Sequence, residues 1–197
     1  MNENIFHGLA VVIFIVAMSI SIYHRLKADR DTGEKVSSKD EATILFFVLR
    51  IGGLVSFFSI VGYLIYPPLL AWSKVGLPES IRWLGVGMGI VGVGLFYWIF
   101  SSLGQGISPT VATRKQHKLV TSGPYHWVRH PLYTVGATNF VAVGIMADSW
   151  FIAMMAVVLF VLLASRTPNE EAHLIEKFGD EYREYVKRTG KFLPKFV

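Results

Sequence analysis

Apolar residues occur in long blocks separated by short polar segments. Three blocks are about 20 residues long, enough to cross the hydrocarbon core of a bilayer as α-helices. Two shorter blocks follow and are separated only by Asp148, which predicts a tight helical hairpin whose arms are tilted or partly shielded by protein. The pattern therefore predicts five transmembrane helices, at residues 5–23, 42–65, 81–103, 132–147 and 149–165.

A different pattern follows the last block. Apolar residues recur at helical spacing over residues 169–189, which predicts an amphipathic helix that Gly190 ends. Thr167, Pro168 and Glu170 fit the N-cap, N1 and N3 positions of a capping box for that helix. The fold class predicted is all-α: a polytopic membrane protein with a helix 4–5 hairpin and a C-terminal amphipathic cytoplasmic helix. Residues 1–197 form a single domain, with three spans in 1–103 and a loop, the hairpin and the last helix in 104–197.

Charge predicts how these helices are oriented. Hydrophobic residues make up 52% of the 197 residues and charged residues 17%, and 16 of the 19 Lys and Arg residues lie in segments 24–41, 104–131 and 166–197. With five spans these segments share one face, which the positive-inside rule makes cytoplasmic, while Lys74 and Arg82 lie on the other face. A basic face against anionic headgroups accounts for the net charge of +5, so no nucleic-acid partner is predicted. The absence of Cys excludes thiolate chemistry.

The polar segment 117–133 is the first candidate for chemistry, because polar groups beside a bilayer are costly unless they have a partner or a role. A turn at Gly123-Pro124 and a second proline, Pro131, present the aromatic, Arg and His side chains between them at the mouth of the fourth span. The aromatics also fit an interfacial belt. The His residues at 117, 126 and 130 are not spaced like a compact ligand set, so no metal site is predicted.

Two further features of the predicted spans are candidates for function, a GxGxxG motif and an arginine. Gly87, Gly89 and Gly92 spell GxGxxG, but inside an apolar helix with no preceding strand, so they are not a dinucleotide site. Gly85, Gly89, Gly92 and Gly94 are better explained as small residues for close helix packing. Arg50 within the second span is a functional candidate by default, although it could also pair with a carbonyl or with Asp148, or snorkel to the interface.

The segments HKLVTSGPYHWVRHPLY (117–133) and RTPNEEAHLIEKFGDEYREYVKRTGKFLP (166–194) together resemble the isoprenylcysteine carboxyl methyltransferase family of integral membrane enzymes, and more closely its short prokaryotic members. The resemblance covers about residues 115–194. It implies that the loop and the start of the C-terminal helix enclose S-adenosylmethionine, and that Glu170 binds this cofactor while Arg166 faces the methyl acceptor, both as catalytic residues. The cofactor contacts that it implies are His117, Lys118, Leu119, Val120, Tyr125, His130, Pro131, Leu132, Tyr133 and Glu170.

The chemistry suits these residue types. Methyl transfer from a sulfonium requires mainly positioning and exclusion of water. A carboxylate acceptor is ionised at neutral pH and needs a cation such as the guanidinium of Arg166, which can grip it at two points. The resemblance thus implies carboxyl O-methylation of an isoprenylcysteine-like, amphiphilic or lipid-linked acceptor at the cytoplasmic face of a membrane, the cytoplasmic membrane if the protein is prokaryotic.

Three alternatives stay open from the sequence. A phospholipid-type N-methyltransferase would need a base, for which Glu171 and His126 are candidates. A sterol-type NADPH reductase has a related architecture but would need a nicotinamide site. A non-catalytic membrane protein would leave the His and Arg density of the loop unexplained.

Overall fold

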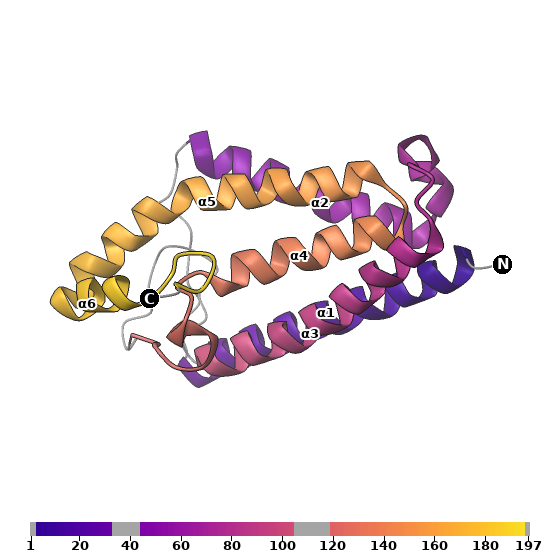
Figure 1. Ribbon diagram of the computed structural model, residues 1–197. Coiled ribbons are helices and arrows are strands. Elements are labelled where there is room, and N and C mark those ends of the chain that lie inside the picture. The colour runs from indigo at the N-terminus through magenta and orange to yellow at the C-terminus, as the bar shows by residue number, and fades with distance from the viewer. Residues whose placement is uncertain (1–2, 33–43, 105–118, 196–197) are drawn as a thin grey trace.

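The computed structural model describes residues 3–32, 44–104 and 119–195, and in these ranges the regular elements are all helices (Figure 1). The predicted all-α class is therefore confirmed for this part of the chain. In chain order the elements are α1 (Glu3–Thr32), α2 (Ile44–Ile65), η1 (Pro67–Ser73), α3 (Glu79–Leu103), η3 (Gly123–His126), α4 (Pro131–Met146), α5 (Trp150–Phe178) and α6 (Asp180–Arg188).

Four helices in the described ranges, α1, α2, α3 and α5, are long and apolar enough to cross a membrane, whereas α4 has only 16 residues. Four of the five predicted spans thus have a matching long helix. Figure 1 shows the long helices running alongside one another, with α4 between α5 and α3. Since α4 packs against both neighbours, its position is set by protein contacts on two sides.

The turn between α4 and α5 is held by its own side chains. Asp148, at the predicted break, has a φ of 55°, and its carboxylate accepts from the backbone N–H groups of Gly76 at 3.1 Å and Leu77 at 2.8 Å. The Ser149 hydroxyl caps α5 by accepting from the N–H of Ile152 at 3.3 Å. These contacts fix the hairpin turn to the segment before α3.

The predicted boundary after the fifth apolar block is wrong. α5 continues without a break through Pro168, so Thr167 is no N-cap and Glu170 is not part of a capping box. A proline inside a helix leaves the carbonyl four residues earlier without its usual donor. Here that carbonyl belongs to Ala164, and the Thr167 hydroxyl donates to it at 2.7 Å. The helix ends instead at Gly179, whose φ of 56° favours glycine.

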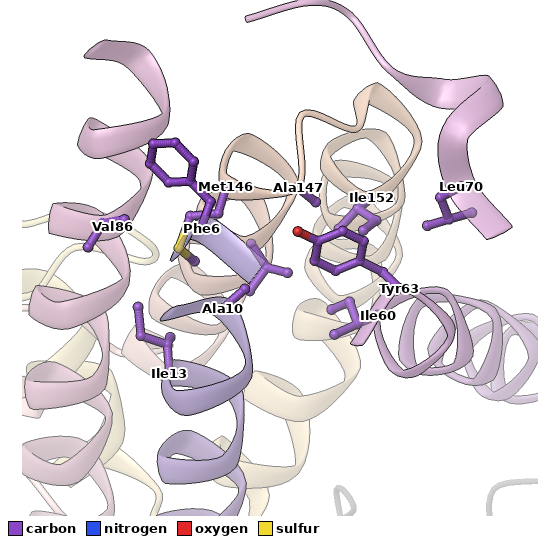
Figure 2. Packing of buried hydrophobic residues seen from close by; sticks show 11 residues of the cluster. Phe6, Ala10, Ile13, Ile60, Tyr63, Leu70, Val86, Met146, Ala147 and Ile152 are labelled. Carbon is purple, nitrogen blue, oxygen red and sulfur yellow. The ribbon is translucent and has the colours of Figure 1, made fainter. Parts of the chain in front are cut away.

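A hydrophobic core lies at the end of the bundle that contains the start of α1. Buried side chains from α1, α2, α3 and the α4–α5 turn meet there, and Figure 2 shows how those of α1 point between the neighbouring helices; the labelled members include Phe6, Ile13, Tyr63, Val86, Met146 and Ile152. Burial of this apolar surface holds α1 against the rest of the bundle.

Glycines of α3 allow its close contacts, as predicted. A Cβ at Gly85 would lie 2.8 Å from the Ile145 side chain of α4, one at Gly89 would lie 2.8 Å from Ile13 of α1, and one at Gly92 would collide with the Asn139 amide. Within the described residues nothing lies near Gly94, so the packing role predicted for that residue is wrong. Gly89 and Gly92 of the literal GxGxxG therefore belong to a helix-packing surface, whereas a Cβ at Gly87 would meet no described atom within 4 Å.

Two arginines, Arg50 and Arg82, differ in their burial. Arg50 is exposed and lies in the second turn of α2, so it is not at mid-span. Arg82 is buried near the start of α3, where its Nε and Nη2 donate to the Met146 carbonyl at 3.0 and 2.6 Å. Its guanidinium also pairs with Glu3 at 3.0 Å and lies 4.2 Å from the centre of the Phe6 ring. Arg82 therefore ties α1 to α3 and to the end of α4.

Candidate active site

The start of α4 and the second half of α5 bring four of the predicted residues together. The Tyr133 hydroxyl donates to Glu170 Oε1 at 2.7 Å, and Arg166 Nε lies 3.2 Å from the same oxygen. His130 Nδ1 lies 3.7 Å from the other carboxylate oxygen of Glu170. Because Arg166 precedes Glu170 by four residues, both project from one face of α5. These residues form what we call the Glu170 cluster.

The neighbouring acid, Glu171, is fully engaged in a second set of contacts. Arg129 Nε donates to Glu171 Oε1 at 2.8 Å and His130 Nε2 donates to the same oxygen at 3.2 Å, while Lys191 Nζ lies 3.7 Å from Oε2. His130 is thus held between two carboxylates, one on each ring nitrogen. The sequence placed Arg129 and Glu171 near the site, but it did not reveal that they pair with each other.

The segment 189–192 forms a strap along the loop before α4. The Gly190 carbonyl accepts from the N–H of Arg129 at 2.9 Å, and the Lys191 carbonyl accepts from the N–H of His130 at 3.0 Å. Arg129 Nη1 donates to the Thr189 carbonyl at 2.5 Å, and the Thr134 hydroxyl donates to the Phe192 carbonyl at 2.8 Å. No sequence signal indicated this pairing, because it joins irregular segments about 60 residues apart.

Three buried tyrosines, Tyr125, Tyr182 and Tyr185, lie where α6 contacts η3. The Tyr185 hydroxyl of α6 donates to the Tyr125 carbonyl at 2.5 Å, which fixes η3 to α6. Burial raises the pKa of Tyr185 to about 12 and also raises the pKa values of Tyr125 and Tyr182, so all three are protonated at neutral pH. Gly123 begins η3 with a φ of 60°, and a Cβ at this position would lie 2.9 Å from the Ser102 Cβ of α3.

The structure also describes several of the other predicted site residues. Leu119 and Val120 are partly exposed in the segment before η3, and Pro131 is buried at the start of α4. His126 is exposed and packs edge-on against Trp127. His117 and Lys118 lie outside the described residues.

An apolar cavity of about 180 Å³ begins beside the cluster. Tyr133 belongs to both, since its ring lines the cavity and its hydroxyl contacts Glu170. The walls come from α1, α3, α4 and α5 and include Phe14, Phe96, Leu132, Asn139 and Leu163. The arrangement joins a charged, hydrogen-bonding site to a cavity shaped for a hydrocarbon chain.

The parts of the chain that the structure describes contain no group of three or more His, Asp or Glu residues that could hold a metal ion. The polar chemistry of this site therefore has to be assessed from its carboxylates, guanidinium groups, imidazole and phenol.

Comparison with known proteins places the chain in a family. The family model described as phospholipid methyltransferase matches residues 80–181, just over half of the chain, and the chain belongs to this family. The match includes α4, α5 and the Glu170 cluster. Together with the isoprenylcysteine methyltransferases among the relatives and solved structures below, it confirms the family resemblance predicted from segments 117–133 and 166–194.

Several curated relatives match part of the chain. A protein-S-isoprenylcysteine O-methyltransferase of Schizosaccharomyces pombe is 37% identical over 95 residues, which cover 46% of this chain and 40% of that protein. A human protein of the same description is 33% identical over 127 residues, 59% of this chain and 43% of that one. A nickel-cobalt-cadmium resistance protein of Alcaligenes xylosoxydans is 34% identical over 85 residues, 43% and 40% of the two chains. The chain matches about two fifths of the length of these relatives.

The fold is shared over a longer stretch. A solved structure of a eukaryotic intramembrane Ras methyltransferase, an isoprenylcysteine carboxyl methyltransferase, superposes with a TM-score of 0.56 at 21% identity. The likeness covers 94% of this chain and 67% of that one. The helices outside the family match thus have the same arrangement in both proteins.

Proposed function

We propose that the protein is an S-adenosylmethionine-dependent membrane methyltransferase that methylates the carboxylate of an isoprenylcysteine-like amphiphile. The observation that carries this proposal is the Glu170 cluster at the mouth of an apolar cavity, with Tyr133 shared between them. Family membership and the names of the eukaryotic relatives support the reaction class.

The residues present fit the cofactor. Its ammonium and sulfonium groups are cationic, and Glu170 supplies carboxylate oxygens that can pair with such a cation. Leu119 and Val120 are apolar and only partly buried, and we propose that they contact the adenine ring. When bound, S-adenosylmethionine would supply an electrophilic methyl group, and Glu170, oriented by Tyr133 and His130, would hold its charged end.

The acceptor would be held at two places. Its hydrocarbon tail would occupy the cavity, which excludes water from the neighbourhood of the reacting groups. Its carboxylate would bind the guanidinium of Arg166, which can form two parallel hydrogen bonds to a carboxylate. In the structure Arg166 Nε lies 3.2 Å from the Glu170 carboxylate. No base is required, because the nucleophile is already ionised. Arg166 therefore orients the acceptor, and Glu170 orients the donor.

Membrane orientation is part of the same proposal. We place the Glu170 cluster on the cytoplasmic face, because His130 lies in the basic segment 104–131 and Arg166 and Glu170 lie in the basic segment 166–197. In this arrangement α4 completes the crossing together with α5 as a hairpin. A cysteine introduced at Lys74 should be labelled by an impermeant reagent from the outside alone, and labelling from the cytoplasmic side alone would overturn this orientation.

A transfer assay tests the activity. Purified protein in detergent would receive S-adenosylmethionine labelled in its methyl group, with a prenylcysteine analogue, phosphatidylethanolamine or no acceptor. We expect base-labile label in the prenylcysteine product, because methyl esters hydrolyse in alkali. Label in phosphatidylethanolamine alone would instead support the N-methyltransferase that the family description names. The structure gives that alternative little support, since Glu171 is engaged by Arg129 and the exposed His126 packs against Trp127.

A further inference from the structure

Asn139 is a polar residue in an apolar part of α4. Its side chain is 6% exposed, and in the described structure neither amide atom has a hydrogen-bond partner. Leaving a buried donor and acceptor unsatisfied is costly, and in a membrane no water compensates for it. The proposed reaction, as described, does not use this residue. Its amide therefore needs either a packing explanation or a partner that arrives from outside the chain.

The position of Asn139 points to such a partner. The residue lines the apolar cavity that begins at Tyr133. It lies six residues further along the same helix, so it sits about 9 Å deeper in the cavity than Tyr133. The amide now rests against Gly92 of α3, in the space that a Cβ at that position would fill. For its amide to meet a ligand in the cavity, the Asn139 side chain would turn away from Gly92 to another staggered rotamer.

We propose that Asn139 determines specificity for an acceptor whose tail carries a hydroxyl group part-way along its length. A hydroxyl is the smallest group that both donates to the amide oxygen and accepts from the amide nitrogen. The acceptor would thus be an amphiphile with a carboxylate head at Arg166, a hydrocarbon tail, and one hydroxyl about 9 Å beyond the level of Tyr133. This inference rests on the proposed function for the identity of the head group, but its contact with the tail can be tested without turnover.

The test uses a series of synthetic S-alkylcysteine acceptors with equal tail lengths. One acceptor has a plain hydrocarbon tail, and each of the others carries a single hydroxyl at a different position along the tail. For each, kcat/KM is measured with wild-type protein, Asn139→Leu and Asn139→Ala. We expect the ratio of hydroxylated to plain acceptor to peak at one hydroxyl position in the wild type, and to fall about fivefold at that position in both variants.

Thr138→Val supplies the matched control. Thr138 neighbours Asn139 on α4 but lines a separate groove between α3, α4 and α5, and its hydroxyl donates to the Thr134 carbonyl at 2.9 Å. Removing that hydroxyl should leave the acceptor ratio at its wild-type value. A ratio that is the same in the wild type and in both Asn139 variants would overturn the proposal, as would an equal fall in Thr138→Val. Asn139→Ala keeps the test valid if the bulkier Leu prevents folding.

A binding measurement separates this inference from the proposed reaction. The same amphiphiles are added without cofactor, and the shift in melting temperature is recorded. If no acceptor is methylated but the hydroxylated amphiphile stabilises the wild type more than Asn139→Leu, the reaction is wrong and the tail contact stands. If both acceptors are methylated with equal ratios in all variants, the reaction stands and Asn139 is a packing residue.

Discussion

The protein has a buried arginine contact at each end of its helix bundle, and the two differ in what surrounds them. Arg82 contacts the Met146 carbonyl, Glu3 and the Phe6 ring, and Figure 2 shows Phe6 and Met146 in the hydrophobic core at that end. At the other end, Arg166 contacts Glu170, whose oxygen also accepts from Tyr133 beside the cavity. A buried charge is tolerated in both places because it is paired, so burial and pairing alone do not identify a functional site.

What distinguishes the two ends is whether a ligand could replace a partner. Arg82 donates twice to the backbone carbonyl of Met146 at the end of α4, a group that belongs to the fold and that a ligand cannot replace without moving the helix end. Arg166 pairs with a carboxylate that is itself shared, and a second carboxylate brought by a ligand can take its place. We therefore treat the Arg82 contact as structural and the Glu170 cluster as exchangeable, and the following variants test that distinction.

Glu170→Gln should have the largest effect. It keeps the size of the side chain but removes the charge that Tyr133, His130 and Arg166 surround. We expect cofactor affinity and methyl transfer to fall about 100-fold, the loss of one or two charge-assisted hydrogen bonds, with little change in melting temperature. Equilibrium binding of labelled S-adenosylmethionine and thermal melting measure the two effects. Since Glu170 is not a helix cap, a large loss of stability without loss of binding would contradict its role.

Arg166→Lys should affect the acceptor and spare the cofactor. Lysine keeps the charge but cannot make two parallel hydrogen bonds to a carboxylate. We expect kcat/KM for the acceptor to fall about 30-fold while cofactor affinity stays within about twofold. Steady-state kinetics at saturating cofactor, combined with cofactor binding, separate the two. Equal losses in both would place Arg166 at the donor and not at the acceptor.

Arg82→Met should show the opposite pattern. The variant leaves the Met146 carbonyl without its donor, which costs about 1–3 kcal/mol of stability. Glu3 is more than half exposed, so the lost ion pair adds little to this. We expect a lower melting temperature in detergent but unchanged kcat/KM below the transition. A selective loss of activity at full stability would mean that the two ends of the bundle are coupled.

Tyr133→Phe should have the smallest effect of the four. The ring still lines the cavity, but Glu170 loses its donor at 2.7 Å. We expect cofactor affinity to fall about tenfold, consistent with one hydrogen bond to a charged group, and the fold to be retained. Isothermal titration of S-adenosylmethionine into the purified variant measures this affinity. Unchanged affinity here and in His130→Ala would mean that the start of α4 does not contact the cofactor.

The helices could be predicted from local pattern, but several of their contacts could not. The ends of α2 at Ile65 and of α3 at Leu103 follow directly from where apolar residues stop. The continuity of α5 was missed because Thr167 compensates for Pro168 through a hydrogen bond that no local sequence signal predicts. Proline followed by acidic residues is typical of a helix start, and here the same residues lie inside a helix.

The candidate site shows the same division. His130, Tyr133, Arg166 and Glu170 were predicted by resemblance, and the structure brings them together. The role of Arg82 and the isolation of Asn139 depend on contacts between residues distant in sequence, such as the one that joins Arg82 to the Met146 carbonyl. Periodicity describes the face a residue occupies, but not which atoms it meets there.

The unbroken path of α5 through Pro168 has a geometric consequence for the kind of acceptor that fits. Leu163 in the cavity wall, Arg166 and Glu170 follow one another at spacings of three and four residues, so they share one stripe of a single helix. Inserting one residue after Leu163 would rotate the charged pair by about 100° away from the cavity, whereas inserting seven would restore the stripe and add about 10 Å. Insertions in α5 can therefore change the separation between the head-group site and the cavity only in steps of about two helical turns. An acceptor that fits would have to differ in length by the same step.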